Sequence, residues 1–286
     1  EGGTMGRPTT SPSPGARLML VTSAALLLTL LFAAGAEAAK SGKLLYAKRI
    51  GSSTTPAHGY AVAAGPKGVT ALAGMQWESG TLYPMVAKHT SAGKQVWLKR
   101  YTVVDEGWAD DVAFDRSGNV YVAATVRSVT SQDIVVLKYS ASGDLLWATL
   151  PYDGEANSYD RAKELAVDAR GDVVVIGESV IGESVLTGRK GIVVLKYKKS
   201  GEFAWAQPAR WDPNPGDPKP AGFEAADLAL DGKGDIYVAG RVSYTGGSSK
   251  ALTFASMWKA RGSDGAELKT WRYTPPDGVE NSSFEA

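Results

Sequence analysis

The residues of this sequence best suited to hold a ligand are carboxylates and aromatic rings that recur between short apolar runs. Asp111, Glu164 and Asp227 stand at equivalent positions of a repeated segment, each at the start of its first apolar run. Hard cations such as calcium take oxygen ligands, so these three acids form a candidate cation site. Two alternatives stay open: the acids pair with a recurring lysine of the same segment, or they are solvated. The recurring lysines are Lys138, Lys196 and Lys259.

Aromatic residues gather with further acids in the segments between the apolar runs. Sites of this composition bind sugars, because the C–H face of a pyranose stacks on a ring while its hydroxyls bond to carboxylates. The alternative is that the rings fold back and cover the edges of the sheets. The aromatic residues are Trp77, Trp108, Tyr152, Tyr159, Trp211 and Tyr244, and the acids beside them are Asp153, Glu155, Asp160, Asp212 and Asp217.

Motifs for catalysis are absent from the sequence. The two histidines, His58 and His89, belong to no metalloprotease motif, and neither a G-x-S-x-G elbow nor a phosphate-binding glycine loop is present. Without cysteine there is no disulfide, thiolate metal site or cysteine nucleophile. Acid pairs such as Asp110 with Asp160 keep polysaccharide cleavage open as an alternative. The sequence favours binding over catalysis, and no cofactor is expected apart from calcium.

The charge balance gives no reason to expect a nucleic-acid partner. Thirty-one lysines and arginines face 30 acids, which leaves a net charge of +1. The hydrophobic share of 44% over 286 residues is enough to fill a core. We therefore expect a folded, globular chain.

The N-terminal segment predicts export. Arg7 and Arg17 precede an apolar run over 18–34, and the small residues that follow resemble a signal-peptidase site with cleavage near Ala38. Residues 1–4 lie upstream of the first methionine, Met5. The alternative is an uncleaved anchor, since the run approaches the roughly 20 residues that span a bilayer. We expect a secreted, periplasmic or cell-surface protein with no membrane contact beyond this segment.

A repeat positions the candidate residues. A shift of 50 positions superimposes Lys88 on Lys138 and Trp97 on Trp147 without a gap. Each copy contains four short runs of β-branched, aromatic or small residues bounded by Gly, Asn, Asp and Ser, which is the pattern of strands. Four antiparallel strands per copy make one blade of a β-propeller. We predict an all-β propeller after residues 1–38, with blades over 58–101, 108–150, 161–207 and 224–273.

The two ends of the repeat predict an incomplete ring. Residues 43–50 match the last strand of a blade that has no preceding strands, and residues 278–286 match the start of a fifth blade. Such an isolated strand can close a propeller by pairing with the last blade. With about four blades present, we expect the chain to be part of a larger ring.

Other repeated residues have structural explanations. Trp97, Trp147 and Trp205 are expected to fill the gap between blades, and Asp115, Asp168 and Asp231 to begin turns by bonding the backbone two residues on. Trp271 lies six residues after its glycine instead of four, so the last strand of the fourth blade departs from the pattern.

The repeat resembles a known family. Asp115-Arg-Ser-Gly118-Asn119-Val-Tyr-Val, followed by Ile134-Val-Val-Leu-Lys-Tyr139 and Leu145-Leu-Trp147, resembles the SBBP-type bacterial β-propeller repeat and, more distantly, the tryptophan-docked repeats of quinoprotein-like propellers. The resemblance covers the chain from Lys43 onward and implies a secreted or surface propeller without a specific activity. Likeness to quinoproteins would imply a quinone and calcium, but no residues here match such sites.

Loop lengths indicate where a ligand would bind. The connection between the second and third strands spans 14 positions from Ala124 to Lys138 but 19 from Gly177 to Lys196, and the connections between blades vary too. This rim is therefore the expected binding face. The leading hypothesis is a non-enzymatic scaffold for a protein or glycan. The alternatives are a secreted polysaccharide hydrolase or lyase that uses rim carboxylates, and a structural blade array within a larger surface protein.

Overall fold

The computed structural model describes Ala47 and residues 49–127, 131–154, 159–181, 189–209, 220–245 and 251–272. The chain divides into residues 1–47 and 48–286, and the second unit holds all the strands. Apart from one short 3-10 turn, Pro66–Gly68, the regular structure of the described residues is β-strand. The expected signal segment lies outside the described residues, and among those described no helix is long and apolar enough to cross a membrane.

In the described part of the chain, sixteen strands form four antiparallel four-stranded sheets, here called blades 1 to 4. Blade 1 contains β1 (Ala57–Ala64), β2 (Thr70–Glu78), β3 (Thr81–His89) and β4 (Gln95–Arg100). Blade 2 contains β5 (Glu106–Phe114), β6 (Val120–Arg127), β7 (Gln132–Tyr139) and β8 (Leu145–Ala148). Blade 3 contains β9 (Arg161–Val167), β10 (Val173–Ile181), β11 (Arg189–Tyr197) and β12 (Phe203–Ala209). Blade 4 contains β13 (Pro220–Leu230), β14 (Ile236–Thr245), β15 (Ala251–Ala260) and β16 (Glu267–Arg272).

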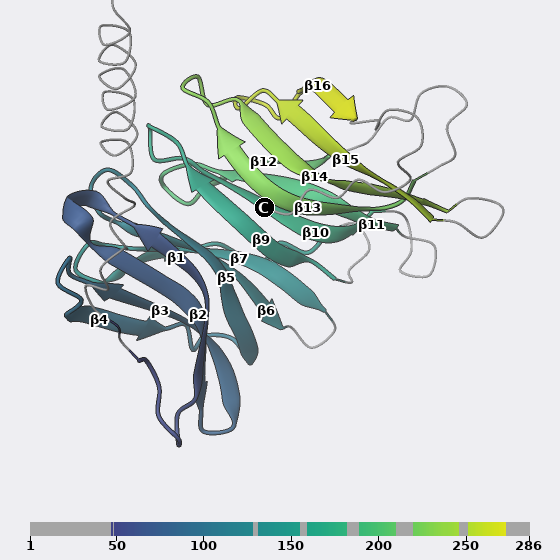
Figure 1. Cartoon of the computed structure of the whole chain (residues 1–286). Coiled ribbons are helices and arrows are strands. Elements are labelled where there is room, and N and C mark those ends of the chain that lie inside the picture. The colour runs from purple at the N-terminus through teal and green to yellow at the C-terminus, as the bar shows by residue number, and fades with distance from the viewer. Residues whose placement is uncertain are drawn as a thin grey trace, which may run out of the picture. The chain divides into compact units, whose positions relative to one another are not determined.

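The blades follow one another so that their first strands β1, β5, β9 and β13 are neighbours in space (Figure 1). Within each blade the strands pair in chain order. The prediction of an all-β propeller with four-stranded blades is confirmed, and across the described residues the blades form an open arc rather than a closed ring. Of the expected isolated strand 43–50, the described residues Ala47, Arg49 and Ile50 are not in a strand, and residues 278–286 lie outside the described part.

Each first strand carries a β-bulge at the same place. The register shifts next to Tyr60, Asp110, Lys163 and Ala226, one residue before the position of the repeated acid in blades 2 to 4. A bulge re-aims the side chains that follow it. The repeated acids of blades 2 to 4 therefore lie directly after the bulge of the first strand of each blade, which we also call the inner strand.

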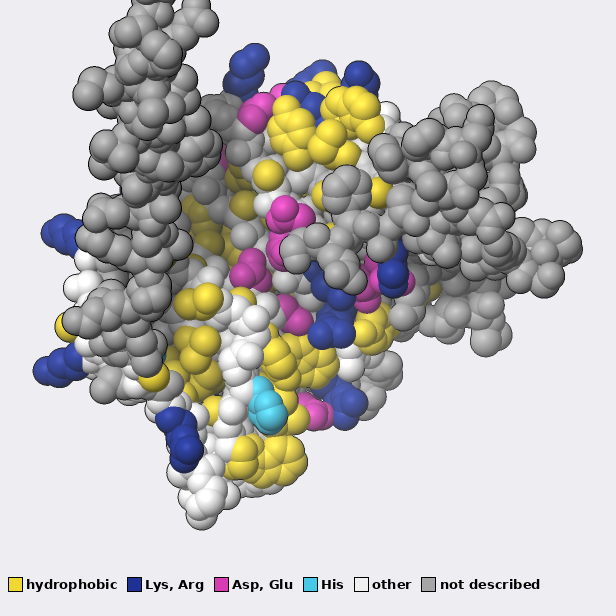
Figure 2. Space-filling view, in the orientation of Figure 1, with side chains coloured by type: hydrophobic (Ala, Val, Ile, Leu, Met, Phe, Trp, Pro, Cys, Tyr) yellow, Lys and Arg dark blue, Asp and Glu magenta, His cyan; other side chains and the backbone are white. Residues whose placement is uncertain are grey.

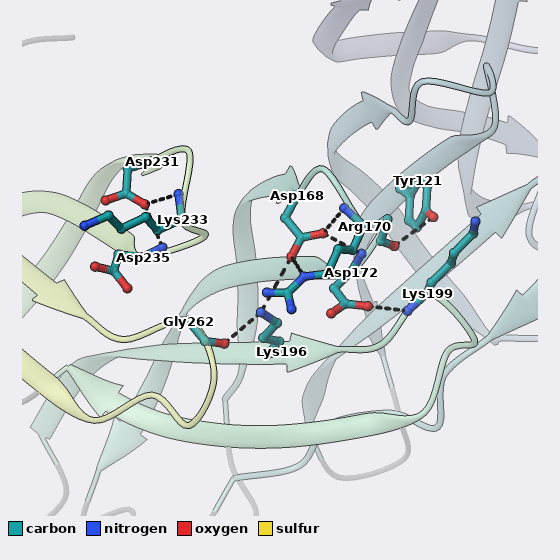
Figure 3. Close-up of polar contacts among 11 residues, drawn as sticks. Tyr121, Asp168, Arg170, Asp172, Lys196, Lys199, Asp231, Lys233, Asp235 and Gly262 are labelled. Atoms are coloured by element: carbon teal, nitrogen blue, oxygen red, sulfur yellow. Dashed lines mark hydrogen bonds and ion pairs between the residues drawn. The ribbon is translucent and has the colours of Figure 1, made fainter.

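The repeated lysine joins each blade to the next. The Nζ of Lys88 donates to the carbonyl oxygens of Gly118 (3.0 Å) and Ala141 (3.1 Å), and that of Lys196 to Gly262 (2.7 Å). Figure 3 shows Lys196 between Gly262 and the carboxylate of Asp168, whose Oδ2 lies 3.8 Å from Nζ. These partners offset the cost of burying an ammonium group.

The repeated aspartate shapes the first turn of blades 2 to 4. Oδ1 of Asp168 accepts hydrogen bonds from the backbone N–H groups of Arg170 (2.8 Å) and Asp172 (3.0 Å), and Asp231 makes the same pair of bonds with Lys233 and Asp235 (Figure 3). The expected turn-forming role is confirmed, because the carboxylate takes up backbone donors that the turn leaves without strand partners.

The repeated tryptophan packs on a glycine of the next blade. Nε1 of Trp97 donates to the Ala141 carbonyl at 3.2 Å, and a Cβ added to Gly143 would lie 2.9 Å from the Trp97 ring. Trp147 meets Gly201 and Trp205 meets Gly265 in the same way, with added Cβ atoms 2.8 and 2.9 Å from the rings. Adjacent blades are therefore held together by tryptophan rings packed so closely on these glycines that a side chain at the glycine position would not fit.

Blade 4 lacks the docking ring at this position. Lys259 pairs with Lys269, whereas Lys88, Lys138 and Lys196 each pair with a tryptophan. The last turn of blade 4 is closed from Arg261 to Ala266, one residue longer than the turn from Thr90 to Lys94 in blade 1. The extra residue precedes Gly265, and Lys269 stands four residues after that glycine, where the other blades have tryptophan. Trp271 lies two residues further along β16 and pairs with Met257.

Candidate functional site

A pocket of about 500 Å³ lies where blade 2 leads into blade 3. One wall consists of residues 149–153, which leave β8, and the other of Tyr197, Gly201 and Phe203 from the end of β11 and the start of β12. Its volume falls within the range of roughly 300–1,000 Å³ typical of small-molecule sites. The pocket therefore lies between the connection from blade 2 to blade 3, a segment whose length varies among the blades, and the turn between the last two strands of blade 3.

The pocket is lined mainly by rings and aliphatic groups. The rings of Tyr197 and Phe203 lie 5.6 Å apart with a 68° interplanar angle, so they meet edge to face. Phe203 is 49% exposed and Leu150 is 87% exposed. Burial raises the pKa of Tyr197 to about 12, and its phenol interacts with the side chain of Thr149. Asp153 adds an exposed carboxylate to the same wall.

Backbone pairing holds the wall that leaves β8. Tyr152 exchanges two hydrogen bonds with Ile134 at the start of β7, at 2.8 and 3.2 Å. Further on, Tyr159 bridges Gln132, and the N–H of Asp160 donates to the Gln132 carbonyl at 2.7 Å. The connection therefore adds two short pairings to the edge of β7, which position Tyr152 and Asp153.

The structure places the aromatic residues expected on the rim in different settings. Tyr152 lines the pocket, and Trp77 in β2 is 42% exposed. The indole of Trp108 donates to Asp110 at 3.0 Å and stacks under Arg161, which interacts with Tyr159. Trp211, with Glu155, Asp212 and Asp217, lies outside the described residues, as does the side chain of Tyr244.

Apart from Tyr152 and Asp153, the sequence did not single out the residues of the pocket as ligand-binding, among them Leu150, Tyr197 and Phe203. Tyr197 and Phe203 repeat the positions of Tyr139 and Leu145 in blade 2. Because these positions recur, the sequence indicates a packing role for them. The signal available for a ligand site was the aromatic ring of Phe203 at a position where blade 2 has Leu145.

Asp110 lies at the bulge of β5 in a nearly closed site. Its carboxylate accepts hydrogen bonds from Thr125 Oγ1 (2.6 Å) and Trp108 Nε1 (3.0 Å), and Arg161 Nε lies 3.6 Å away. Burial raises the pKa of Asp110 to about 6, although these partners oppose the shift. Asp160, the suggested partner for acid chemistry, instead accepts a hydrogen bond from the Gly154 N–H at 2.8 Å.

The repeated acids of the inner strands bind the backbone of the next blade. Oδ2 of Asp111 accepts from the Leu165 N–H at 2.8 Å, and Oε2 of Glu164 from the Leu228 N–H at 2.9 Å. Asp227 accepts from the same Leu228 N–H at 2.8 Å. Figure 2 shows acidic side chains gathered near the middle of this face, over β5, β9 and β13.

The electrostatics of these acids follow from their proximity. Burial, together with the negative charges of Asp227 and Asp111, raises the pKa of Glu164 to about 7. The recurring lysines do not relieve this repulsion, since Lys196 and Lys259 pair with the turn aspartates Asp168 and Asp231. In the described part of the chain, the three acidic groups whose oxygens all lie within 4.8 Å of one another are a different set: Asp133, Asp153 and Asp160.

No family model matches this sequence, and neither does any curated protein. A protein of unknown function from Dyadobacter fermentans is 12% identical, with a TM-score of 0.52 over 78% of this chain and 70% of that one. The α-L-arabinanase of Penicillium chrysogenum, in complex with arabinobiose, is also 12% identical, with a TM-score of 0.51 over 79% and 69%. The shared fold is a β-propeller. At these identities the likeness assigns no function to individual residues.

A third structure, of a protein of unknown function from Bacteroides caccae, is 13% identical with a TM-score of 0.44. The match covers 78% of this chain but 64% of that one, so the chain spans less than two thirds of its length.

Proposed function

We propose that this protein is the binding module of an exported β-propeller and that the pocket between blades 2 and 3 holds a carbohydrate without cleaving it. The observation that carries the proposal is the pocket itself, about 500 Å³ in volume, with aromatic and aliphatic walls and the Asp153 carboxylate. The resemblance of the repeat to SBBP-type bacterial repeats and the signal-like N-terminal segment support export and a place on the cell surface or in the medium.

The wall chemistry suits a sugar ring. The half-exposed Phe203 and the Tyr152 beside it offer apolar faces on which the C–H groups of a pyranose or furanose can stack. The exposed carboxylate of Asp153 can accept hydrogen bonds from the hydroxyl groups of the sugar. The same pocket binds a charged or purely polar ligand poorly, because its walls supply a single carboxylate and much apolar surface.

A second candidate is a polysaccharide hydrolase. The observation that favours it is the pair of raised acid pKa values, about 6 for Asp110 and about 7 for Glu164, on a fold also found in an arabinanase bound to arabinobiose. We rank it second because both carboxylates already have protein partners. Asp110 accepts two side-chain hydrogen bonds, and Glu164 ties blade 3 to Leu228, whereas a general acid must reach its substrate.

The test compares binding and cleavage on one panel of oligosaccharides and polysaccharides. Phe203→Ala removes a pocket ring, and Leu145→Ala is its matched control, since Leu145 occupies the same position of blade 2 at a similar 45% exposure and does not line the pocket. We expect the native chain and Leu145→Ala to be retained on a subset of glycans, and Phe203→Ala to lose retention. Equal retention of Phe203→Ala, or no retention of the native chain, rejects the proposal.

Reducing-end release measured on the same panel separates the two functions. Binding without release supports the binding module. Release that Glu164→Gln abolishes would establish the hydrolase instead.

A further inference from the structure

Three carboxylates converge beside the connection from blade 2 to blade 3. Asp133 comes from the start of β7, while Asp153 and Asp160 come from the connection itself, and one oxygen of each lies within 4.8 Å of the others. Asp133 is 4% exposed and Asp160 is 1% exposed. Within the described part of the chain, none of the ion pairs involves any of the three. Negative charge is therefore concentrated here without a described cationic side chain against it.

The Asp160 carboxylate has an unsatisfied oxygen. Oδ2 accepts the hydrogen bond from the Gly154 N–H, but Oδ1 is buried and has no hydrogen-bond partner among the described residues. The Ser179 side chain lies near this carboxylate and, like the Gly154 N–H, opposes the rise of its pKa. A buried carboxylate oxygen without a partner is unfavourable, and a bound cation is one way to satisfy it. The side-chain oxygen of Gln132, next to Asp133 in β7, is also buried without a partner in this part of the chain.

The charges of the cluster act on one another. Burial raises the pKa of Asp160, and the charges of Asp153 and Asp133 raise it further. Burial and the Asp133 charge likewise raise the pKa of Asp153. Such mutual repulsion is what a divalent ion removes when carboxylates share it as ligands.

We propose that Asp133, Asp153 and Asp160 bind a calcium ion. The donors are all oxygens, which selects a hard cation over zinc or copper. The three oxygens lie within 4.8 Å of one another, close enough to share one hard cation. Calcium accepts several carboxylates in a flexible geometry, whereas magnesium usually keeps several waters and binds through one or two carboxylates, so three carboxylates favour calcium. Water molecules complete its six to eight ligands.

The ion would tie the connection to the edge of blade 2. Asp133 is fixed in β7, whose backbone pairs with Tyr152 and Tyr159 nearby, and Asp153 belongs to the pocket wall. Calcium would reinforce these few backbone bonds by linking both parts of the connection to the sheet. The site does not depend on the proposed glycan function, because the ion can be measured without any sugar.

The test is calcium binding to the chelator-treated full chain, measured by isothermal titration calorimetry and by terbium luminescence sensitised through nearby tyrosines. We expect one calcium per chain, and binding at least about tenfold weaker in Asp153→Asn and in Asp160→Asn, because each loses a charged ligand. Asp153 is exposed, so its variant retains the fold even if Asp160→Asn does not, and circular dichroism checks both. Asp144→Asn, in an exposed turn, is the control and should bind as the native chain does.

Three results would overturn the proposal. The first is no calcium binding by the native chain at millimolar concentration, and the second is unchanged binding in Asp153→Asn. The third is loss of binding in Glu164→Gln with unchanged binding in Asp160→Asn, which would place the ion at the inner-strand acids. Calcium binding that persists in Phe203→Ala, whatever happens to glycan retention, separates this site from the sugar pocket.

Discussion

Substituting Gly143 by alanine tests whether a ring packed on a glycine holds blades 1 and 2 together. Gly143 has φ +97°, and an added Cβ would lie 2.9 Å from Cγ of Trp97, whose side chain is 8% exposed. The left-handed backbone alone costs alanine about 1–2 kcal/mol. The overlap with a buried ring adds about 1–3 kcal/mol, as overpacking of a core does. We expect Gly143→Ala to lower the free energy of unfolding by about 2–5 kcal/mol.

Gly80 offers the matched control. Its φ is +90°, but an added Cβ would have no heavy atom within 4 Å, so Gly80→Ala should cost about 1–2 kcal/mol from the backbone alone. Urea unfolding followed by far-ultraviolet circular dichroism measures both variants. In a Trp97→Ala background, Gly143→Ala should cost no more than Gly80→Ala does. Equal losses for the two glycine variants in the native background would refute the packing argument.

Two further predictions concern buried charges. Lys196→Met leaves the buried carboxylate of Asp168, whose side chain is 6% exposed, without its ammonium partner, so the free energy of unfolding should fall by about 3–5 kcal/mol. Lys198→Met, at an exposed ion pair, is the control and should change stability by under about 1 kcal/mol in the same urea experiment. Because the pKa of Asp110 is raised from 3.8 to about 6, the folded state binds the proton more tightly than the unfolded state, and stability should fall by up to about 3 kcal/mol as pH rises from 4 to 6. Unfolding free energies measured across this range should lose that part of the slope in Asp110→Asn; an unchanged slope would contradict the assignment.

The blade architecture was predictable because its contacts recur at one spacing. The turn made by Asp168 involves its own neighbours, and the contact of Trp97 with Gly143 joins equivalent turns of adjacent blades. Each residue type is therefore required again one repeat later, and a simple shift of the sequence exposes it. The missing ring was visible in the same way, since Lys269 stands four residues after Gly265, where the other blades have tryptophan.

The role of the repeated acids was harder to predict. Asp111 and Glu164 were expected to bind a cation, to pair with a recurring lysine or to be solvated. The structure shows each accepting a backbone N–H from the following blade. That contact depends on the bulge one residue earlier, which turns the side chain toward the neighbouring strand, and no residue type in the sequence marks such a bulge.

The pocket and the proposed calcium site arise where the repeat is broken. Asp133 occupies a position at which blade 1 has Tyr83 and blade 3 has Gly191, counted back from the recurring lysine. The repeat does not require an aspartate at this position, because the other blades assemble without it. Asp153 likewise lies in a connection without an equivalent elsewhere. In a repeat protein, residues that recur in every blade are explained by the packing of the blades. A buried carboxylate found in one blade only, such as Asp133, beside the Asp160 oxygen that lacks a hydrogen-bond partner, is therefore the stronger indication of a bound ligand.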